Sequence, residues 1–344
     1  MLLDNINLDE KVFIVAELSA NHGKDIEIAK MTIKAAKESG ADAIKVQTYT
    51  ADTLTIDSNK DYFKLNRGTI WDGRTLYDLY SEGTLPWEWH KELMSYANSL
   101  GLTFFSTPFD KTAVDFLEEL NVPVYKVSSF EVLDIPLLEY IASKGKPIII
   151  STGIATLSDI EEAVTACKRM GNDQIILLKC TSSYPAKIED ANLNTIPNMK
   201  ETFGTMIGLS DHTIGITVPV LSVAMGARVI EKHFILEKAI GGPDASFSME
   251  PEEFKMMVDS VREAELALGK VDYTLTEQKK NNRLSGRSLF AVKDVKKGEV
   301  FNESNIRSIR PGYGLPPKYL KEILGKVATS NLEKGTPLTW NDFK

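Results

Sequence analysis

Residues 147–180 read PIIISTGIATLSDIEEAVTACKRMGNDQIILLKC, and this stretch predicts a strand, a helix and a second strand in that order. The runs 147–152 and 175–180 are nearly continuous in apolar residues, which is typical of parallel strands covered on both faces. Residues 158–170 between them have the spacing of an amphipathic helix, and Ser158 with Glu161 is expected to form its capping box. The stretch therefore predicts a βαβ unit.

The same alternation continues in both directions along the chain. Further strands are expected at 12–18, 43–48, 103–107, 124–129, 206–210 and 229–234, and further helices at 26–39, 87–100, 111–120, 136–144, 217–226 and 251–267. Eight strands that alternate with helices at near-regular spacing favour a (β/α)8 barrel, with a doubly wound sheet as the alternative. We therefore expect an α/β protein built on a TIM barrel.

The pattern changes after Gly269. Residues 270–284 are polar and are expected to form a linker, while residues 285–344 contain short strands and Lys-Gly turns. We expect a barrel domain over residues 1–269, the linker over 270–284, and a small, mostly β domain over 285–344.

Composition narrows the function classes. The chain has 344 residues, of which 43% are hydrophobic and 26% charged, as in ordinary soluble proteins. The net charge of -8 argues against general nucleic-acid binding, and no apolar run approaches the roughly 20 residues of a membrane span. The N-terminus lacks a signal-peptide pattern, and Cys167 and Cys180 offer no disulfide framework. We expect a cytoplasmic protein that binds neither nucleic acid nor membranes.

Polar side chains gather where the predicted strands end. Because the active site of such a barrel lies at the carboxyl ends of its strands, these residues form the candidate site. They are Glu17, Lys45, Gln47, Thr107, Lys126, Ser129, Glu131, Ser151, Ser182, Tyr184, Ser210, His212 and His233.

Lys45 and Lys126 lie within otherwise apolar strands, where an unpaired charge is costly. They either pair with carboxylates such as Glu17, Glu131 or Glu231, or bind an anionic ligand. Hydroxyl groups at neighbouring strand ends, on Thr107, Ser129, Ser151 and Ser210, would supply directed hydrogen bonds to phosphate oxygens. The pattern favours an anion site.

His212 and His233 follow two of the predicted strands. Two imidazoles and water form an open metal site, and so few protein ligands suit Mn²⁺ or Mg²⁺ better than zinc. Asp211 and Asp244 are candidates to join this site. His90 lies on a predicted helix and is expected to serve packing.

The long stretch 49–86 is rich in aromatic residues. A connection of this length on a barrel is either a lid or substrate wall, or a packed surface excursion.

Several motifs resemble those of the sialic acid synthase family, in order along the chain. They are Ala16-Glu17 with Asn21-His22, Lys45-x-Gln47, Ser106-Thr107-Pro108, Tyr125-Lys126, Ser151-Thr152-Gly153, Ser210-Asp211-His212-Thr213, Glu231-Lys232-His233-Phe234 and Gly242-Pro243-Asp244. The segment from Arg287 to Leu324-Gly325 resembles that family's antifreeze-like (SAF, β-clip) domain.

The resemblance implies a phosphoenolpyruvate-dependent nonulosonate synthase, a transferase that joins phosphoenolpyruvate to an N-acetylated amino sugar. It implies a divalent metal, typically Mn²⁺ with Mg²⁺ or Co²⁺ also possible, bound by His212 and His233. The phosphoenolpyruvate contacts would be Lys45, Thr107, Lys126, Ser129, Ser151 and Ser210, with Ser182 as a shorter replacement for the family's asparagine. The sugar and proton-transfer positions would be Glu17, Gln47, Glu131, Tyr184 and Asp244. Arg287 would reach the sugar in the partner subunit's site, which implies a domain-swapped homodimer.

Some segments depart from the N-acetylneuraminate synthase pattern and resemble pseudaminic acid synthases. They are 16–22, 68–72, 180–184 and 310–317. The acceptor would then be 2,4-diacetamido-2,4,6-trideoxy-L-altrose, and the runner-up is an N-acetylneuraminate or legionaminate synthase. Two hypotheses from different classes are a non-catalytic sugar- or ice-binding protein and a metal-dependent pyruvate aldolase.

Overall fold

The computed structural model describes residues 1–66 and 68–344. Its internal contacts divide the chain into two compact units, Met1–Gly269 and Lys270–Lys344. The segment expected to be a linker contains helix α11 (Glu277–Arg283), whose N-cap is Thr276.

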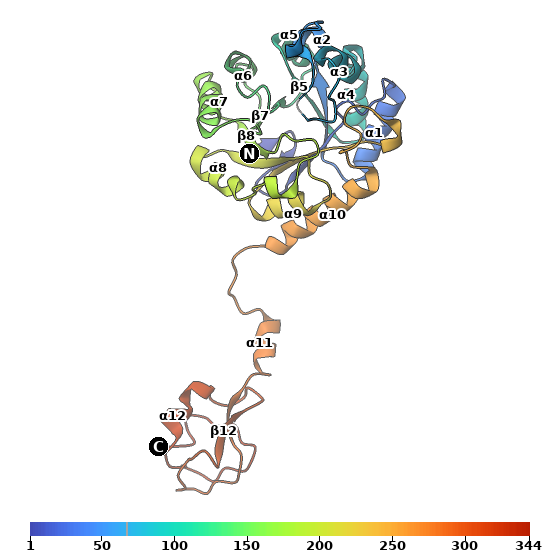
Figure 1. Cartoon of the computed structure of the whole chain (residues 1–344). Helices are drawn as coiled ribbons and strands as arrows, with labels where there is room; N and C mark the ends of the chain where they lie inside the picture. Colours follow the sequence, from blue (N-terminus) through green and yellow to red (C-terminus); the bar gives the residue numbers. More distant parts are fainter. Residues whose placement is uncertain (67) are drawn as a thin grey trace. The chain divides into compact units, whose positions relative to one another are not determined.

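The first unit is a closed barrel of parallel strands (Figure 1). Around the barrel the order is β10, β3, β4, β5, β6, β7, β8 and β9, so neighbours in sequence are neighbours in space. The strands are β3 (Phe13–Glu17), β4 (Ala43–Thr48), β5 (Thr103–Pro108), β6 (Tyr125–Val127), β7 (Ile148–Ser151), β8 (Ile175–Cys180), β9 (Met206–Asp211) and β10 (Val229–His233). The expected barrel is confirmed, and the doubly wound sheet is excluded.

Helices surround the strands on the outside of the barrel (Figure 1). They are α1 (Ile26–Glu38), α4 (His90–Ser99), α5 (Lys111–Glu119), α6 (Ile135–Ala142), α7 (Leu157–Arg169), α8 (Thr195–Phe203), α9 (Thr217–Ala224) and α10 (Pro251–Leu268). Their apolar faces pack on the outward side chains of the strands in two large clusters. Seven of these helices match the expected ranges to within a few residues.

The βαβ unit at residues 147–180 is present as β7, α7 and β8, but its cap differs from the prediction. The N-cap is Thr156, whose side chain accepts from the Asp159 N–H while the Asp159 carboxylate accepts from the Thr156 N–H. Ser158 is exposed inside the first turn, so the predicted Ser158–Glu161 box is wrong. Two overlapping polar pairs fit the same sequence pattern, and the chain uses the earlier pair.

The sequence did not reveal helix α8. Its apolar positions are sparse, and Pro197 falls in its first turn, where a missing N–H costs no helical hydrogen bond. The long connection 49–86 also contains short helices, namely α2 (Ala51–Leu54), η1 (Asp61–Phe63) and α3 (Leu76–Gly83).

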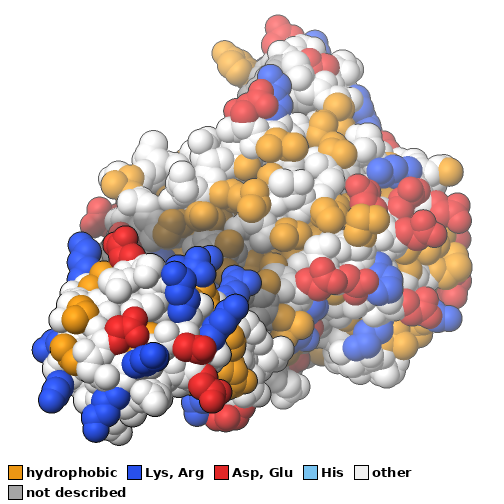
Figure 2. All heavy atoms as spheres, turned by 90° about the horizontal axis from the view of Figure 1, so that it is seen from below, with side chains coloured by type: hydrophobic (Ala, Val, Ile, Leu, Met, Phe, Trp, Pro, Cys, Tyr) orange, Lys and Arg blue, Asp and Glu red, His pale blue; other side chains and the backbone are white. Residues whose placement is uncertain are grey.

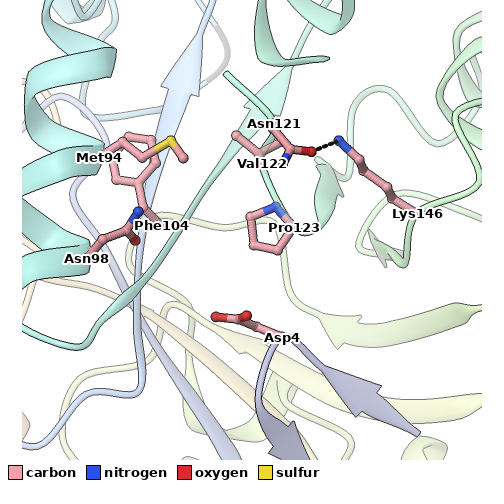
Figure 3. Close-up of a pocket in the computed structure, with 8 residues that line it drawn as sticks. All are labelled: Asp4, Met94, Asn98, Phe104, Asn121, Val122, Pro123 and Lys146. Carbon is pink, nitrogen blue, oxygen red and sulfur yellow. Dashed lines mark hydrogen bonds between the residues drawn. The ribbon is translucent and has the colours of Figure 1, made fainter. Parts of the chain in front are cut away.

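A hairpin of β1 (Leu2–Leu3) and β2 (Ile6–Asn7) covers the amino ends of the barrel strands. Leu3 and Leu8 pack with Phe13 and Phe105 inside the barrel. Beside the hairpin, Figure 3 shows a pocket of about 290 Å³ bounded by Asp4, Met94, Asn98, Phe104, Asn121, Val122, Pro123 and Lys146. It lies at the amino ends of the strands, away from the candidate site residues.

The second unit is small and mostly β, as expected. Strands β11 (Ser288–Ala291) and β12 (Ile306–Ile309) pair antiparallel, followed by η5 (Pro317–Tyr319) and α12 (Leu320–Ile323). Its own apolar core includes Leu289, Val295, Phe301 and Leu338.

The two units differ in charge. Residues 270–344 contain 15 Lys and Arg against 8 Asp and Glu, while residues 1–269 contain 25 against 40. Figure 2 shows the basic side chains spread over the second unit. Across residues 1–66 and 68–344, the structure has no helix with the length and apolar character needed to cross a membrane.

Candidate active site

Strand register brings the first polar residues together at the carboxyl ends of the barrel strands. His233 on β10 is paired with Glu17 on β3, and Glu17 is paired with Lys45 on β4. Because the pairing is parallel, these side chains occupy the same level of the barrel. Apolar residues fill the barrel beneath them, so the site opens only at this end.

Two buried lysines share carboxylates at the centre of this site. Lys45 Nζ lies 2.7 Å from Glu17 Oε2 and 3.6 Å from Glu231 Oε1, and Lys126 Nζ lies 3.8 Å from Glu231 Oε1. Hydroxyl groups complete the set, since Lys45 donates to Thr107 Oγ1 at 3.2 Å and Lys126 donates to Ser151 Oγ at 2.8 Å. The ion pairing that the sequence offered as one alternative is therefore present, with hydroxyl groups beside it, and anion binding at these lysines stays a prediction.

These contacts shift the pKa values in different directions. Burial raises the pKa of Glu17, and the neighbouring Glu231 carboxylate adds to this against the effect of Lys45. Burial opposes the ionised form of Glu231 too, but Lys126 and Lys45 outweigh it and lower the pKa of that carboxyl. Burial lowers the pKa of Lys126, and the Lys45 charge works in the same direction. Glu231 is thus the anion that holds the two cations together, while Glu17 is the carboxyl most ready to take up a proton.

A second group of hydroxyls surrounds Gly153, which follows β7. Its N–H donates to Ser129 Oγ at 3.1 Å, and a Cβ at position 153 would lie 2.1 Å from Ser182 Oγ and 2.9 Å from Ser129 Oγ. Only glycine leaves room for this arrangement. Ser182 therefore lies with Ser129. Ser210 is paired in register with both Cys180 and Glu231.

The two histidines lie side by side, with ring centroids 5.3 Å apart. The Nδ1 atom of His212 hydrogen-bonds the carbonyl oxygen of Thr181 at 3.0 Å, so Nδ1 carries the proton and Nε2 keeps its lone pair. His233 Nδ1 is buried and has no hydrogen-bond partner among the described residues. Burial holds the pKa of His233 well below its ordinary value, and the positive charges of Lys45 and Lys232 act in the same direction.

Aromatic rings pack against the histidines. The Tyr184 ring lies 4.3 Å from His212 and 5.2 Å from Phe247, centroid to centroid. Trp71, from the long connection 49–86, lies 5.5 Å from Tyr184, and its Nε1 donates to Pro243 O at 2.9 Å. At least this part of the connection forms a wall of the site.

A chain of polar contacts links the lysine cluster to the histidines. Gln47 Nε2 donates to Glu17 Oε1 at 3.0 Å and to Ser19 Oγ at 2.9 Å, and Ser19 donates to Asp244 Oδ2 at 2.5 Å. Asp244 Oδ2 lies 3.8 Å from His233 Nδ1, and burial raises the pKa of its carboxyl.

Glu131 lies just beyond β6 and hydrogen-bonds the Ser128 hydroxyl. Burial raises the pKa of its carboxyl, against the weaker effects of Ser128 and Lys126. Glu131 has no ion pair within 4 Å among the described residues, unlike Glu17.

Three further residues singled out from the sequence, Cys180, His90 and Arg287, lie in different surroundings. Cys180 is buried, as expected, but burial is outweighed by hydrogen bonds with His212, Ser129 and Ser182, and its pKa falls to about 7. His90 packs between Phe104 and Phe116, as expected. Arg287 is exposed on the second unit, where its Nη1 donates to Ser308 O at 2.9 Å.

The structure adds Ser19 and Phe247 to the site, which the sequence missed, and it adds Trp71, which the sequence offered only as part of the segments 49–86 and 68–72. Ser19 could have been found, because it lies between the Glu17 and Asn21 motif positions. Trp71 and Phe247 lie in long connections, whose paths the sequence pattern does not predict.

The fold and the site define the class of protein. It is a (β/α)8-barrel protein whose strand ends form a lysine and hydroxyl cradle beside two imidazoles. Residues 32–273 match the model of the NeuB family, and residues 286–344 match the SAF domain. The chain belongs to the NeuB family.

Named relatives and a solved structure cover most or all of the chain. A pseudaminic acid synthase of Campylobacter jejuni is 48% identical over 344 residues, covering all of both chains. A pseudaminic acid synthase of Helicobacter pylori is 48% identical over 332 residues, covering 96% of this chain and 97% of the relative. The crystal structure of an N-acetylneuraminic acid synthetase from Leptospira borgpetersenii superimposes with a TM-score of 0.73 at 32% identity, covering 82% of this chain and 94% of that one.

Proposed function

We propose that this protein is a pseudaminic acid synthase. It condenses phosphoenolpyruvate with 2,4-diacetamido-2,4,6-trideoxy-L-altrose and water, and releases pseudaminic acid and phosphate. The observation that carries the proposal is the buried pair Lys45 and Lys126 with its hydroxyl cradle, in a chain 48% identical throughout to pseudaminic acid synthases. An N-acetylneuraminate or legionaminate synthase is the alternative.

Phosphoenolpyruvate binds at the lysine cluster. The carboxylates of Glu17 and Glu231 already neutralise the two ammonium groups. A ligand of high negative charge must therefore replace one of these carboxylates as the partner of a lysine. Lys45 turns from Glu17 to the ligand, while Lys126 keeps Glu231. The hydroxyls of Thr107, Ser129, Ser151, Ser182 and Ser210 then donate to the phosphate and carboxylate oxygens.

The residues present fit a divalent metal at His212 and His233. His212 uses Nδ1 for the Thr181 carbonyl, which leaves Nε2 as its metal-binding nitrogen, and His233 Nδ1 has no hydrogen-bond partner among the described residues. The low pKa of His233 keeps that ring neutral, as a metal ligand must be. No group of three His, Cys, Asp or Glu in residues 1–66 and 68–344 is arranged to hold a metal. Two imidazoles are few protein ligands for zinc, which favours Mn²⁺, with Mg²⁺ or Co²⁺ as substitutes. When bound, the metal supplies Lewis acidity toward the aldehyde oxygen of the sugar.

The reaction forms a bond from C3 of phosphoenolpyruvate to the aldehyde carbon. The aldehyde oxygen takes a proton and becomes a hydroxyl. Water adds at C2, the bond from C2 to the phosphate oxygen breaks, and the second proton of the water goes to the departing phosphate, so that C2 becomes a ketone carbon. A carboxylate must take the proton of the attacking water. Glu131 suits this task because its partner is a neutral hydroxyl, and its raised pKa makes it a stronger base than an ordinary glutamate. Glu17 loses its ion-pair partner when Lys45 turns to the ligand, so Glu17 takes up a proton.

The acceptor sugar lies on the side of the site where Gln47, Tyr184 and Asp244 meet the histidines. The altrose derivative has a methyl group at C6 and a second acetamido group, so apolar walls suit it better than a polar pocket. Trp71 and Phe247 supply such walls next to Tyr184.

The rest of the proposed organisation concerns the whole chain. Residues 1–269 form the barrel domain, 270–284 the linker and 285–344 the SAF domain. We propose a cytoplasmic, domain-swapped homodimer in which Arg287 reaches the sugar in the partner subunit. The exposure of Arg287 and the opposite net charges of the two units support this arrangement.

The test is phosphate release from phosphoenolpyruvate in the presence of Mn²⁺ with each candidate sugar. The altrose derivative is expected to give turnover, and N-acetylmannosamine is not. Turnover with N-acetylmannosamine but not with the altrose derivative rejects this acceptor in favour of the alternative. Turnover with pyruvate in place of phosphoenolpyruvate would indicate an aldolase instead.

A further inference from the structure

Lys232 lies between Glu231 and His233 on β10, but its side chain points away from the site. Side chains alternate along a strand, and Glu231 faces the lysines inside the barrel. Lys232 is therefore directed toward the outer layer, where its side chain is only 2% exposed. Burying an ammonium group there costs free energy unless hydrogen bonds and an opposite charge compensate for it.

The ammonium of Lys232 binds the segment that carries His212. Its Nζ lies 2.5 Å from Asp211 Oδ2, 2.5 Å from Thr213 O and 3.3 Å from Gly215 O. Asp211 and Thr213 are the residues on either side of His212. One side chain on β10 thus holds the chain immediately before and after the histidine that follows β9.

Asp211 also closes the turn around His212. Its Oδ1 accepts from the Thr213 N–H at 3.1 Å, and its Oδ2 accepts from the Thr213 hydroxyl at 3.0 Å. This side-chain turn presents the imidazole, while Lys232 anchors the turn to the strand that ends in His233. The two histidines are therefore linked through a short, fully buried path.

We infer that Lys232 and Asp211 are positioning residues that fix His212 relative to His233, and so set the affinity of the site for a divalent metal. A buried ion pair adds little net stability compared with an apolar pair of the same shape, so its value here is geometric. Outer partners of metal ligands act in this way, and losing one typically weakens metal binding by about 10- to 100-fold. The inference rests on the proposed metal site.

The experiment measures Mn²⁺ binding by calorimetry to the full chain after metal has been removed with a chelator. The unmodified protein and His212→Ala are measured first. The proposed metal site itself is wrong if the unmodified protein does not bind Mn²⁺, or if His212→Ala does not abolish that binding. If that site is present, the dissociation constant of Lys232→Met for Mn²⁺ tests the positioning role alone.

Lys232→Met is expected to raise the dissociation constant for Mn²⁺ about 10- to 100-fold. Asp211→Asn keeps the shape of the turn and removes the charge, so it is expected to weaken binding in the same direction. The double variant is expected to be no weaker than Lys232→Met, because the two side chains act as one unit. Asp211→Asn decides the question if Lys232→Met does not fold.

Arg262→Met is the matched control. Arg262 Nη2 lies 2.6 Å from Asp42 Oδ2 in an ion pair at the amino ends of the strands. It is expected to lower the melting temperature without changing the dissociation constant for Mn²⁺. An unchanged constant in Lys232→Met and Asp211→Asn, or an equal rise in Arg262→Met, overturns the inference.

Discussion

The Nζ atom of Lys45 lies 2.7 Å from Glu17 Oε2, and both side chains are almost completely buried. The ion pair occupies the place where the proposed site must receive a highly charged anion. The ion pair therefore has to open when phosphoenolpyruvate binds. The Glu17 carboxylate then has no cationic partner, which favours its protonation.

Binding of phosphoenolpyruvate is expected to be coupled to proton uptake by Glu17. Burial already raises the pKa of this carboxyl, and an incoming anion that draws Lys45 away raises it further. At pH 8 a phosphate monoester, with a second pKa of about 6, is fully ionised and takes up no proton itself. Calorimetry in buffers of different ionisation enthalpy measures the uptake, which Glu17→Gln should abolish.

Glu118→Gln is the control, because Glu118 pairs with Lys146 far from the lysine cluster. It should leave proton uptake unchanged. If Glu231→Gln removed the uptake and Glu17→Gln did not, the proton would go to Glu231 and this assignment would be wrong.

The activity should depend on pH through Glu131. Burial raises the pKa of this carboxyl above the ordinary 4.5, and a general base works only when ionised. kcat/KM should therefore fall as the pH drops through this raised pKa, with an acidic limb above the pH at which an exposed glutamate would titrate. Glu131→Gln should lower kcat by about 100-fold or more and remove the limb. A limb that survives in Glu131→Gln but disappears in Glu17→Gln would assign the base to Glu17.

Gly153→Ala should weaken binding of phosphoenolpyruvate. The new Cβ would lie 2.1 Å from Ser182 Oγ and 2.9 Å from Ser129 Oγ, so the hydroxyls must move. Overpacking of this kind costs about 1–3 kcal/mol, which corresponds to a rise in the dissociation constant of roughly 5- to 150-fold. Adding Ser182→Gly to Gly153→Ala removes the shortest contact and should recover part of the binding. No effect of Gly153→Ala would mean that these serines do not contact the ligand.

The sequence predicted the barrel, and it predicted which polar residues gather at the strand ends, for a specific physical reason. The end of each strand can be recognised in the sequence, because the apolar run stops there. Parallel register then brings together residues as distant in sequence as Glu17, Lys45 and His233. It could not decide between ion pairing and anion binding at Lys45, because that depends on rotamers. The approach of Trp71 to Tyr184 and Pro243 depends on the path of a long connection, which no periodic pattern describes.

Trp71→Ala should raise KM for the sugar while leaving KM for phosphoenolpyruvate nearly unchanged. The indole contacts the Tyr184 ring and bonds Pro243 O, on the histidine side of the site and not at the lysines. Trp71→Phe keeps a ring but loses the hydrogen bond, so it should have a smaller effect. Trp87→Phe is the matched control, because Trp87 Nε1 also donates to a backbone carbonyl, that of Tyr49, at 3.1 Å. An equal change in both KM values would argue against a role in sugar recognition.

Arg287→Ala should also raise KM for the sugar far more than KM for phosphoenolpyruvate, but by a route that depends on the dimer. Arg287 is exposed on the second unit, and in the proposed dimer it reaches the site of the other subunit. Arg307→Ala, an exposed arginine on β12 of the same unit, should leave both constants unchanged. Mixing Arg287→Ala with a barrel variant such as Lys45→Met should then restore up to about a quarter of the unmodified activity, since mixed dimers contain one site free of both changes. Absence of such complementation, with confirmed subunit exchange, would place Arg287 in its own subunit's site or in none.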